Sequence, residues 1–175
     1  IMRTYKVNAY RAYATSALRE TENRLIILDM IKNRTGLDIE VLSNSEQRFL
    51  DYKAIASKGE GFQKIIEKGT AIVDIGGGSV QISLFDNDTL VSTQNLRLGV
   101  LRIQEYLNRF DVRKSRIENV IDEMTMAQLS NYKKLYLKDR EIRNLIVIDD
   151  YISPLAVKRA GGDSGKAVIS GETFD

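Results

Sequence analysis

The sequence predicts an α/β fold. Short runs of alternating apolar residues, such as residues 80–85, have the period of strands. They alternate along the chain with longer segments of helical period, such as residues 21–34 and 113–138. The chain has 175 residues, of which 43% are apolar and 29% charged, and this balance suits a soluble globular protein of one ordinary domain or two small ones.

The elements follow one another in a regular order. Strands are predicted over residues 6–14, 39–42, 70–74, 80–85, 90–98 and 144–149. Residues 14–19 turn from the first strand into a helix, and further helices are predicted over residues 21–34, 43–57, 99–108, 113–138 and 153–159. The loop at residues 86–88 is short, so strands 80–85 and 90–98 should be antiparallel.

Two helix boundaries carry clear signals. Gly36 follows the helix over 21–34 and can supply a left-handed cap. Ser43 and Glu46 have the spacing of a capping box, which predicts a helix start there. The charged, glycine-bearing residues 59–68 then form a predicted connection between two α/β blocks, residues 1–58 and 69–175.

Composition excludes several classes of protein. The net charge is only +2, which does not predict specific binding of nucleic acid, although it suits a polyanionic ligand. The chain has no cysteine and no histidine, so thiolate metal sites and histidine bases are absent. No apolar run is long enough to span a membrane, and we expect a cytoplasmic protein. Since the chain starts at Ile1, close to a strand, we also expect it to be cut from a longer protein.

The most informative stretch is residues 74–79, Asp-Ile-Gly-Gly-Gly-Ser, between two strands. Three glycines allow a tight turn whose backbone N–H groups can hold phosphate oxygens, with the Ser79 hydroxyl as a further donor. Asp74 at the strand end can hold a magnesium ion, directly or through water. The alternative is a glycine-rich hairpin without a ligand. A P-loop is excluded, because no Gly-Lys-Ser/Thr follows and no helix begins there.

Four segments form an ordered set around this turn. They read Ala-Thr-Ser-Ala-Leu-Arg with Asn-Arg (residues 14–24), Thr-Gly with Ile-Glu-Val-Leu-Ser (35–43), Asp-Ile-Gly-Gly-Gly-Ser (74–79), and Arg-Leu-Gly-Val-Leu-Arg with Glu (97–105). In order and spacing the set resembles the motifs of the exopolyphosphatase/guanosine-pentaphosphate phosphohydrolase (Ppx/GppA) family of the actin-like superfamily.

The resemblance implies an actin-like (ribonuclease H-like) fold, with mixed sheets flanked by helices. Residues 1–58 would be the C-terminal part of the first domain and residues 69–175 most of the second. It further implies that the chain binds polyphosphate or guanosine penta- or tetraphosphate in an inter-domain cleft, with Mg²⁺. By the same resemblance Gly76, Gly77, Gly78, Ser79 and Arg19 would bind phosphate, the Arg19 guanidinium offering a fork of donors. Asp74 would bind the metal.

The chain departs from the family at several of these positions. Gln47 stands where the family has its general base Glu, and Gln81 stands where it has a metal-supporting Glu. Glu46, one residue away, is a possible weak substitute base, although its capping role directs it toward the helix start. Asp149 and Asp150 occupy a position where the family has a small glycine-bearing turn, and their charges would repel phosphates.

Three hypotheses therefore stay open. The chain is the core of a working exopolyphosphatase-type hydrolase, or it is an inactive member that acts as a phosphate-ligand sensor or protein-interaction module, or it is an ATP-using kinase or chaperone. An amide can orient a water molecule but cannot accept its proton as a carboxylate does. Because strands of the first block would have open edges, we also expect a homodimer.

Overall fold

The computed structural model describes residues 2, 4–57 and 61–149. The chain divides into two compact units, residues 1–59 and 60–175, and the division falls at the start of the predicted connection over residues 59–68. Each unit is an α/β structure. The predicted helix over residues 153–159 lies outside the described residues.

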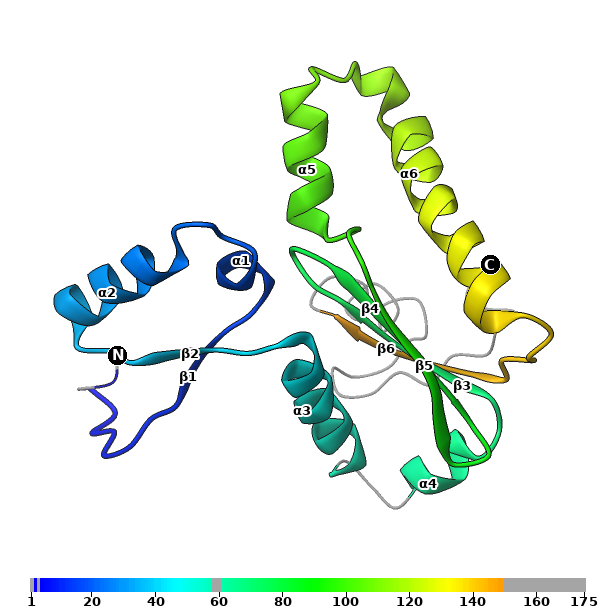
Figure 1. The fold of residues 1–175 in the computed structure, drawn as a ribbon, viewed down its shortest axis with the longest axis horizontal. Helices are drawn as coiled ribbons and strands as arrows, with labels where there is room; N and C mark the ends of the chain where they lie inside the picture. Colours follow the sequence, from blue (N-terminus) through cyan, green and yellow to red (C-terminus); the bar gives the residue numbers. More distant parts are fainter. Residues whose placement is uncertain (1, 3, 58–60, 150–175) are drawn as a thin grey trace. The chain divides into compact units, whose positions relative to one another are not determined.

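The first unit is a β–α–β arrangement (Figure 1). Its two strands, β1 and β2, pair in parallel, with Ala12 opposite Ile39. Two helices join them and a third follows; the bounds are β1 (Ala12–Ala14), α1 (Ser16–Arg19), α2 (Arg24–Thr35), β2 (Ile39–Val41) and α3 (Asn44–Ala56). The prediction of a strand over residues 6–14 was wrong for residues 6–11. The three residues of β2 pair with Ala12–Ala14, so β2 has no residue left to pair with residues 6–11.

Both predicted cap signals of this unit are confirmed. Gly36 ends α2 in the left-handed region with φ of 74°, and its N–H donates to the Lys32 carbonyl at 2.8 Å. Ser43 and Glu46 form a full capping box at the start of α3, each side chain accepting from the backbone N–H of the other. Local chemistry therefore fixes where these two helices end and begin.

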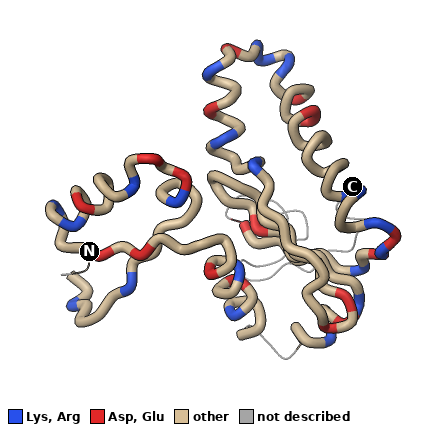
Figure 2. Tube along the Cα trace, in the orientation of Figure 1, with Lys and Arg blue, Asp and Glu red and all other residues tan. Residues whose placement is uncertain are grey.

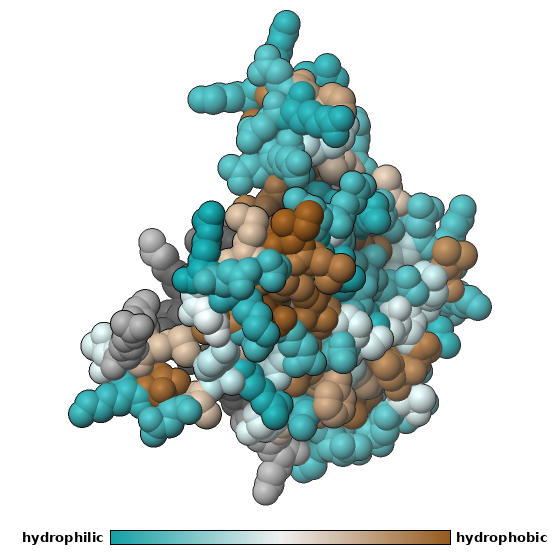
Figure 3. Space-filling view, turned by 60° about the vertical axis from the view of Figure 1, so that its left-hand side comes forward, coloured by the Kyte–Doolittle hydropathy of each residue, from teal (hydrophilic) through white to brown (hydrophobic). Residues whose placement is uncertain are grey.

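The described residues of the first unit form very little core. Leu42 is the one apolar residue buried among them. Leu25, Ile26 and Phe49 are 75%, 63% and 59% exposed. Figure 3 shows a patch of apolar surface among hydrophilic residues on the face that it presents. A sheet of two short strands offers the helices of this unit little surface to cover.

The second unit contains a four-stranded mixed sheet in the order β5-β4-β3-β6. The neighbours β3–β4 and β4–β5 are antiparallel, the second pair as its short loop at residues 86–88 predicted, and β6 is parallel to β3 after a helical crossover. Its elements are α4 (Gly61–Ile66), β3 (Thr70–Ile75), β4 (Val80–Asp86), β5 (Thr89–Leu96), α5 (Val100–Arg109), η1 (Lys114–Arg116), α6 (Ile117–Tyr132), η2 (Lys133–Leu137) and β6 (Asn144–Asp149). The predicted helix over 113–138 thus forms as a 3₁₀ turn, α6 and a π turn.

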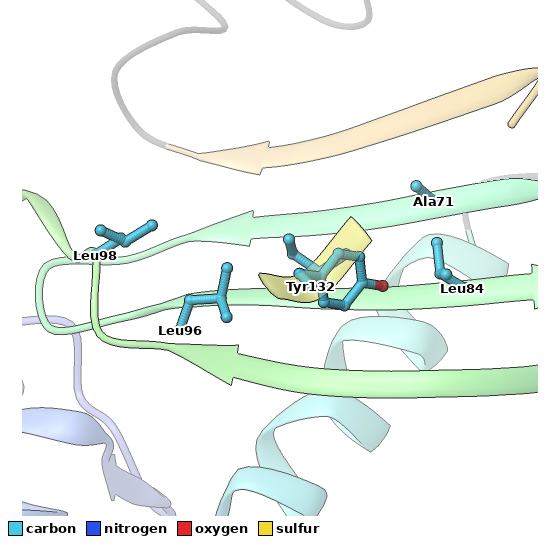
Figure 4. Packing of buried hydrophobic residues seen from close by; sticks show 6 residues of the cluster. Ala71, Leu84, Leu96, Leu98 and Tyr132 are labelled. Carbon is cyan, nitrogen blue, oxygen red and sulfur yellow. The ribbon is translucent and has the colours of Figure 1, made fainter. Parts of the chain in front are cut away.

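One face of this sheet carries the core. Tyr132 of α6 packs there, only 7% exposed, against apolar side chains of the strands (Figure 4). The other buried members of the cluster are Ala71, Ile82, Leu84, Leu96 and Leu98. On the opposite face β4 directs Gln81 and Ser83, each 2% exposed, because side chains alternate along a strand. A polar row is therefore built into the sheet.

The described chain has neither a long segment of one charge sign nor a long apolar helix. Basic and acidic residues are interspersed along its trace (Figure 2), in keeping with the net charge of +2. Among the described residues, no helix combines the length and the apolar character that a membrane crossing requires.

Candidate functional site

The glycine turn lies at one edge of the sheet in the second unit. It joins the end of β3 to the start of β4, and the Gly76 N–H donates to the Ser79 carbonyl at 3.0 Å to close it. Because β6 is parallel to β3, its last residue Asp149 lies beside Ile75 at the same edge. Strand ends of this kind are common ligand sites in α/β proteins. Asp150 lies outside the described residues.

The carbonyl groups of the turn are held by the start of α5. Three consecutive carbonyl oxygens, those of residues 76–78, accept hydrogen bonds from its first residues: Val100 N to Gly76 O at 3.2 Å, Leu101 N to Gly77 O at 2.9 Å, and Arg102 Nε to Gly78 O at 2.9 Å. In a trans peptide the N–H points away from the C=O of the same plane. The N–H groups of residues 77–79 are therefore directed away from the donors of α5.

These three N–H groups have no acceptor among the residues that the structure describes. Successive backbone N–H groups turned to one side form a concave donor set that suits an anion. Gly76, Gly77 and Gly78 all keep φ outside the positive range, so glycine is not needed for backbone conformation here. A Cβ on Gly77 would lie 3.0 Å from Leu101 Cδ1, the end of a flexible side chain that is 61% exposed and can move aside.

Asp74 and Gln81 face each other across the β3–β4 ladder. They are direct partners in register, and Gln81 Nε2 donates to Asp74 Oδ2 at 3.4 Å. Gln81 Oε1 is buried and has no hydrogen-bond partner among the described atoms, and the same is true of Asn95 Oδ1 on the next strand. Burying a polar oxygen without a hydrogen-bond donor destabilises the folded state, so these oxygens suit a bound cation or a hydrogen-bond donor of a ligand.

A magnesium ion fits these residues in part. Mg²⁺ is commonly held by one or two carboxylates together with the phosphates of a ligand. Asp74 offers a carboxylate. Gln81 offers a neutral oxygen if its side-chain amide is flipped, so that Oε1 and Nε2 exchange places. The surrounding hydrogen-bond partners decide between these two orientations. Within the described part of the chain, no group of three or more His, Cys, Asp or Glu side chains could hold a metal. The set is weaker than the two carboxylates that the family pattern provides.

Arg19 and Gln47 meet in the first unit. Arg19 NH1 donates to the Leu42 carbonyl at 2.7 Å, and NH1 and NH2 both lie 3.5 Å from Gln47 Oε1. The guanidinium is half-buried, and burial lowers the pKa of Arg19 from its ordinary value. The structure thus brings together the expected phosphate cation and the amide at the general-base position.

Glu46 is directed elsewhere. Its Oε2 accepts from the Ser43 N–H at 2.8 Å. The hydrogen bond with the Ser43 side chain, and then that with the Ser43 backbone, hold the pKa of Glu46 below its usual value of 4.5. A carboxylate with a lowered pKa is a weaker base, so these contacts favour the capping role over the substitute-base role.

The sequence reasoning missed two residues of the second unit. Arg102, which holds the Gly78 carbonyl, was counted as part of a motif without a role. Asn95 extends the polar row beyond Gln81, and only the strand register reveals it. The alternation of residues 90–98 shows which of them share a face of the strand. It does not show that Asn95 lies opposite Gln81, because that depends on the register of the two strands.

The chain is similar in sequence to known proteins. A family model for the Ppx/GppA phosphatase family matches residues 1–168, and the chain belongs to this family. Exopolyphosphatase 1 of Mycobacterium tuberculosis is 29% identical over 93 residues, which are 53% of this chain and 26% of that protein. The guanosine-5'-triphosphate,3'-diphosphate pyrophosphatase of Photobacterium profundum is 24% identical over 127 residues, 66% of this chain and 24% of that protein.

Solved structures support the fold. An exopolyphosphatase from Cytophaga hutchinsonii superposes with a TM-score of 0.63 at 20% identity, over 91% of this chain and 51% of that chain. A Ppx/GppA family member from Aquifex aeolicus gives a TM-score of 0.58 at 22% identity, over 90% of this chain and 48% of that one. The expected actin-like fold is confirmed. The chain spans about a quarter of these curated relatives and about half of these solved chains.

The capping box predicts a pH-dependent contribution to stability. Because the pKa of Glu46 is lowered in the folded state, its carboxylate stabilises the fold above the unfolded-state pKa, and this stabilisation is lost as pH falls through the folded-state pKa. The free energy of unfolding of wild type should therefore exceed that of Glu46→Gln at neutral pH. The difference should vanish well below pH 4.5.

Urea denaturation of both proteins across this range measures the effect. The same comparison in a Ser43→Ala background is the control, and there the pH-dependent difference should be smaller. A difference between wild type and Glu46→Gln that stays constant to low pH would contradict the assignment.

Proposed function

We propose that this chain binds the phosphate groups of inorganic polyphosphate or a guanosine polyphosphate at the glycine turn. The observation that carries the proposal is the set of three N–H groups, residues 77–79, turned to one side without a described acceptor. Such a set can donate to several oxygens of one phosphate. The names of the relatives, which include an exopolyphosphatase and a guanosine-5'-triphosphate,3'-diphosphate pyrophosphatase, support this class of ligand.

Further groups add to phosphate binding. Ser79 carries a hydroxyl beside the last N–H of the set. In the first unit, and independently of this turn, Arg19 carries a guanidinium with more donors than its two acceptors use, which suits a phosphate group. Gln47 and Gln81 each replace an acid of the family pattern by a neutral amide. Each replacement removes a negative charge that would repel a polyanion, so both favour binding.

The same two amides weaken hydrolysis. Attack of water on a phosphoanhydride needs a positioned water and a proton acceptor. Gln47 can orient the water through its carbonyl or amide group, but it does not take the proton. We therefore propose that the chain hydrolyses terminal phosphoanhydride bonds slowly and acts chiefly as a phosphate-ligand sensor.

Magnesium is proposed to accompany the ligand. Asp74 would hold the ion with the ligand phosphates, and Gln81 Oε1 would add a neutral oxygen. When bound, the ion would neutralise phosphate charge. Turning the Gln81 amide over to present Oε1 would replace its present hydrogen bond from Nε2 to Asp74 Oδ2.

We also propose that the first unit pairs with a second copy of the chain. No described strand covers the outer edges of β1 and β2, and Leu25, Ile26 and Phe49 are largely exposed. Open edges and unburied apolar side chains favour association. Sedimentation equilibrium should give twice the 19.8 kDa mass of the chain, and Phe49→Glu should shift the protein toward monomer. A monomer for wild type at high concentration would contradict this.

Restoring the family acid at the base position should accelerate hydrolysis. In Gln47→Glu the new carboxylate would lie beside the Arg19 guanidinium and could accept the proton of the attacking water. General-base assistance is worth about a hundredfold to ten-thousandfold. Phosphate release from long-chain polyphosphate with Mg²⁺ should rise by a factor in this range relative to wild type, and further in Gln47→Glu/Gln81→Glu.

Gln63→Glu is the matched control, because it adds the same charge at an exposed position of α4. Wild-type turnover as fast as that of ordinary exopolyphosphatases, or no gain in the double variant, would contradict the proposed slow hydrolysis.

Restoring the second acid should make stability depend on a metal ion. Gln81→Glu would place a buried carboxylate opposite Asp74, and two such charges repel each other unless a cation lies between them. With EDTA the variant should be about 3 kcal/mol less stable than wild type. Mg²⁺ or Mn²⁺ should restore most of the loss in a thermal melt.

The exposed substitution Gln128→Glu on α6 provides the comparison and should not respond to the metal. Equal stability of Gln81→Glu with EDTA and with Mg²⁺ would rule out Asp74 and residue 81 as the metal position.

A further inference from the structure

The contact between α5 and the glycine turn is unusually close. Gly99 immediately precedes α5, and a Cβ built on it would lie 2.2 Å from Gly78 C and 2.3 Å from Gly77 O and Ser79 N. Real Cβ atoms do not approach backbone to such distances, so any larger residue would push the helix start off the turn. Gly99 is therefore required for the helix to reach the turn at all.

The hydrogen bonds across this contact are of two kinds. Backbone N–H groups at the start of α5 hold the carbonyls of Gly76 and Gly77. The Gly78 carbonyl is held by a side chain, through Arg102 Nε at 2.9 Å. Arg102 also donates its own backbone N–H to Gly77 O at 3.3 Å, so both its backbone and its side chain contact the turn.

The Gly78 carbonyl controls the last donor of the anion-binding set. It shares a peptide plane with the Ser79 N–H, and the two groups point in opposite directions. A hydrogen bond that fixes the carbonyl therefore fixes the direction of the Ser79 N–H. The guanidinium is partly buried at this contact, and hydrogen bonds from charged donors are stronger than neutral ones.

We propose that Arg102 is a positioning residue for phosphate binding, acting through the Gly78–Ser79 peptide. It holds this peptide so that the Ser79 N–H joins those of Gly77 and Gly78 on the ligand side. This inference rests on the proposed phosphate binding at the glycine turn. It adds that the geometry of the donor set depends on a side chain of α5.

Two substitutions separate hydrogen bonding from charge. Gln carries an N–H donor the same number of bonds from Cα as Arg Nε, but no charge. The Met side chain ends at the same number of bonds from Cα and carries neither a donor nor a charge. Binding of tripolyphosphate would be measured by isothermal titration calorimetry for wild type, Arg102→Gln and Arg102→Met. Arg109→Met, at the exposed end of α5, is the control for loss of a positive charge from the same helix.

Arg102→Met should weaken tripolyphosphate binding about tenfold, the effect of losing one charge-assisted hydrogen bond. Arg102→Gln should stay closer to wild type than to Arg102→Met, and Arg109→Met should bind as wild type. Thermal melts check that each variant folds, and if Arg102→Met does not fold, the comparison of Arg102→Gln with wild type decides.

The possible failures are distinguishable. No binding by wild type would overturn the proposed function and this inference with it. Binding by wild type and equally by Arg102→Met would overturn only the role of Arg102. Binding by Arg102→Gln as weak as that by Arg102→Met would show that charge, and not positioning, is what Arg102 contributes.

Discussion

The functional edge of this protein depends on the hydrogen bonds from α5 to the carbonyl groups of the glycine turn. Once the carbonyls of residues 76–78 accept from α5, the planarity of the peptide directs the N–H groups of residues 77–79 to the other side. The sheet supports this arrangement by placing the end of β3 and the starts of β4 and α5 at one edge. Gly99 allows the close approach.

Two amides, Gln47 in the first unit and Gln81 in the second, distinguish the chemistry of this chain. Gln81 donates a hydrogen bond from its side-chain amide to Asp74, whereas a carboxylate at this position would need a cation between the two acids. Gln47 accepts from the Arg19 guanidinium, whereas a carboxylate there would form an ion pair with it. Both changes lower the negative charge that a polyanion would meet, and both remove groups that assist hydrolysis. The tight binding and slow turnover that we propose would both follow from these two substitutions.

Much of the fold could be predicted because its signals are local. The caps at Gly36 and Ser43, the short loops and the glycine turn are all decided by nearby residues. Residues 6–11 were misassigned because pairing them in a strand depends on how much sheet lies beside them, and no local pattern shows this. Arg102 was missed for a similar reason, since its partner Gly78 is 24 residues away in sequence.

The most direct test of the account is an NMR titration of the ¹⁵N-labelled chain with tripolyphosphate, which reports on each backbone amide separately. The account predicts that the amide signals of Gly77, Gly78 and Ser79 shift together and saturably, because their N–H groups donate to the ligand. Saturable shifts confined to other parts of the chain, or no shifts at these three amides, would contradict it.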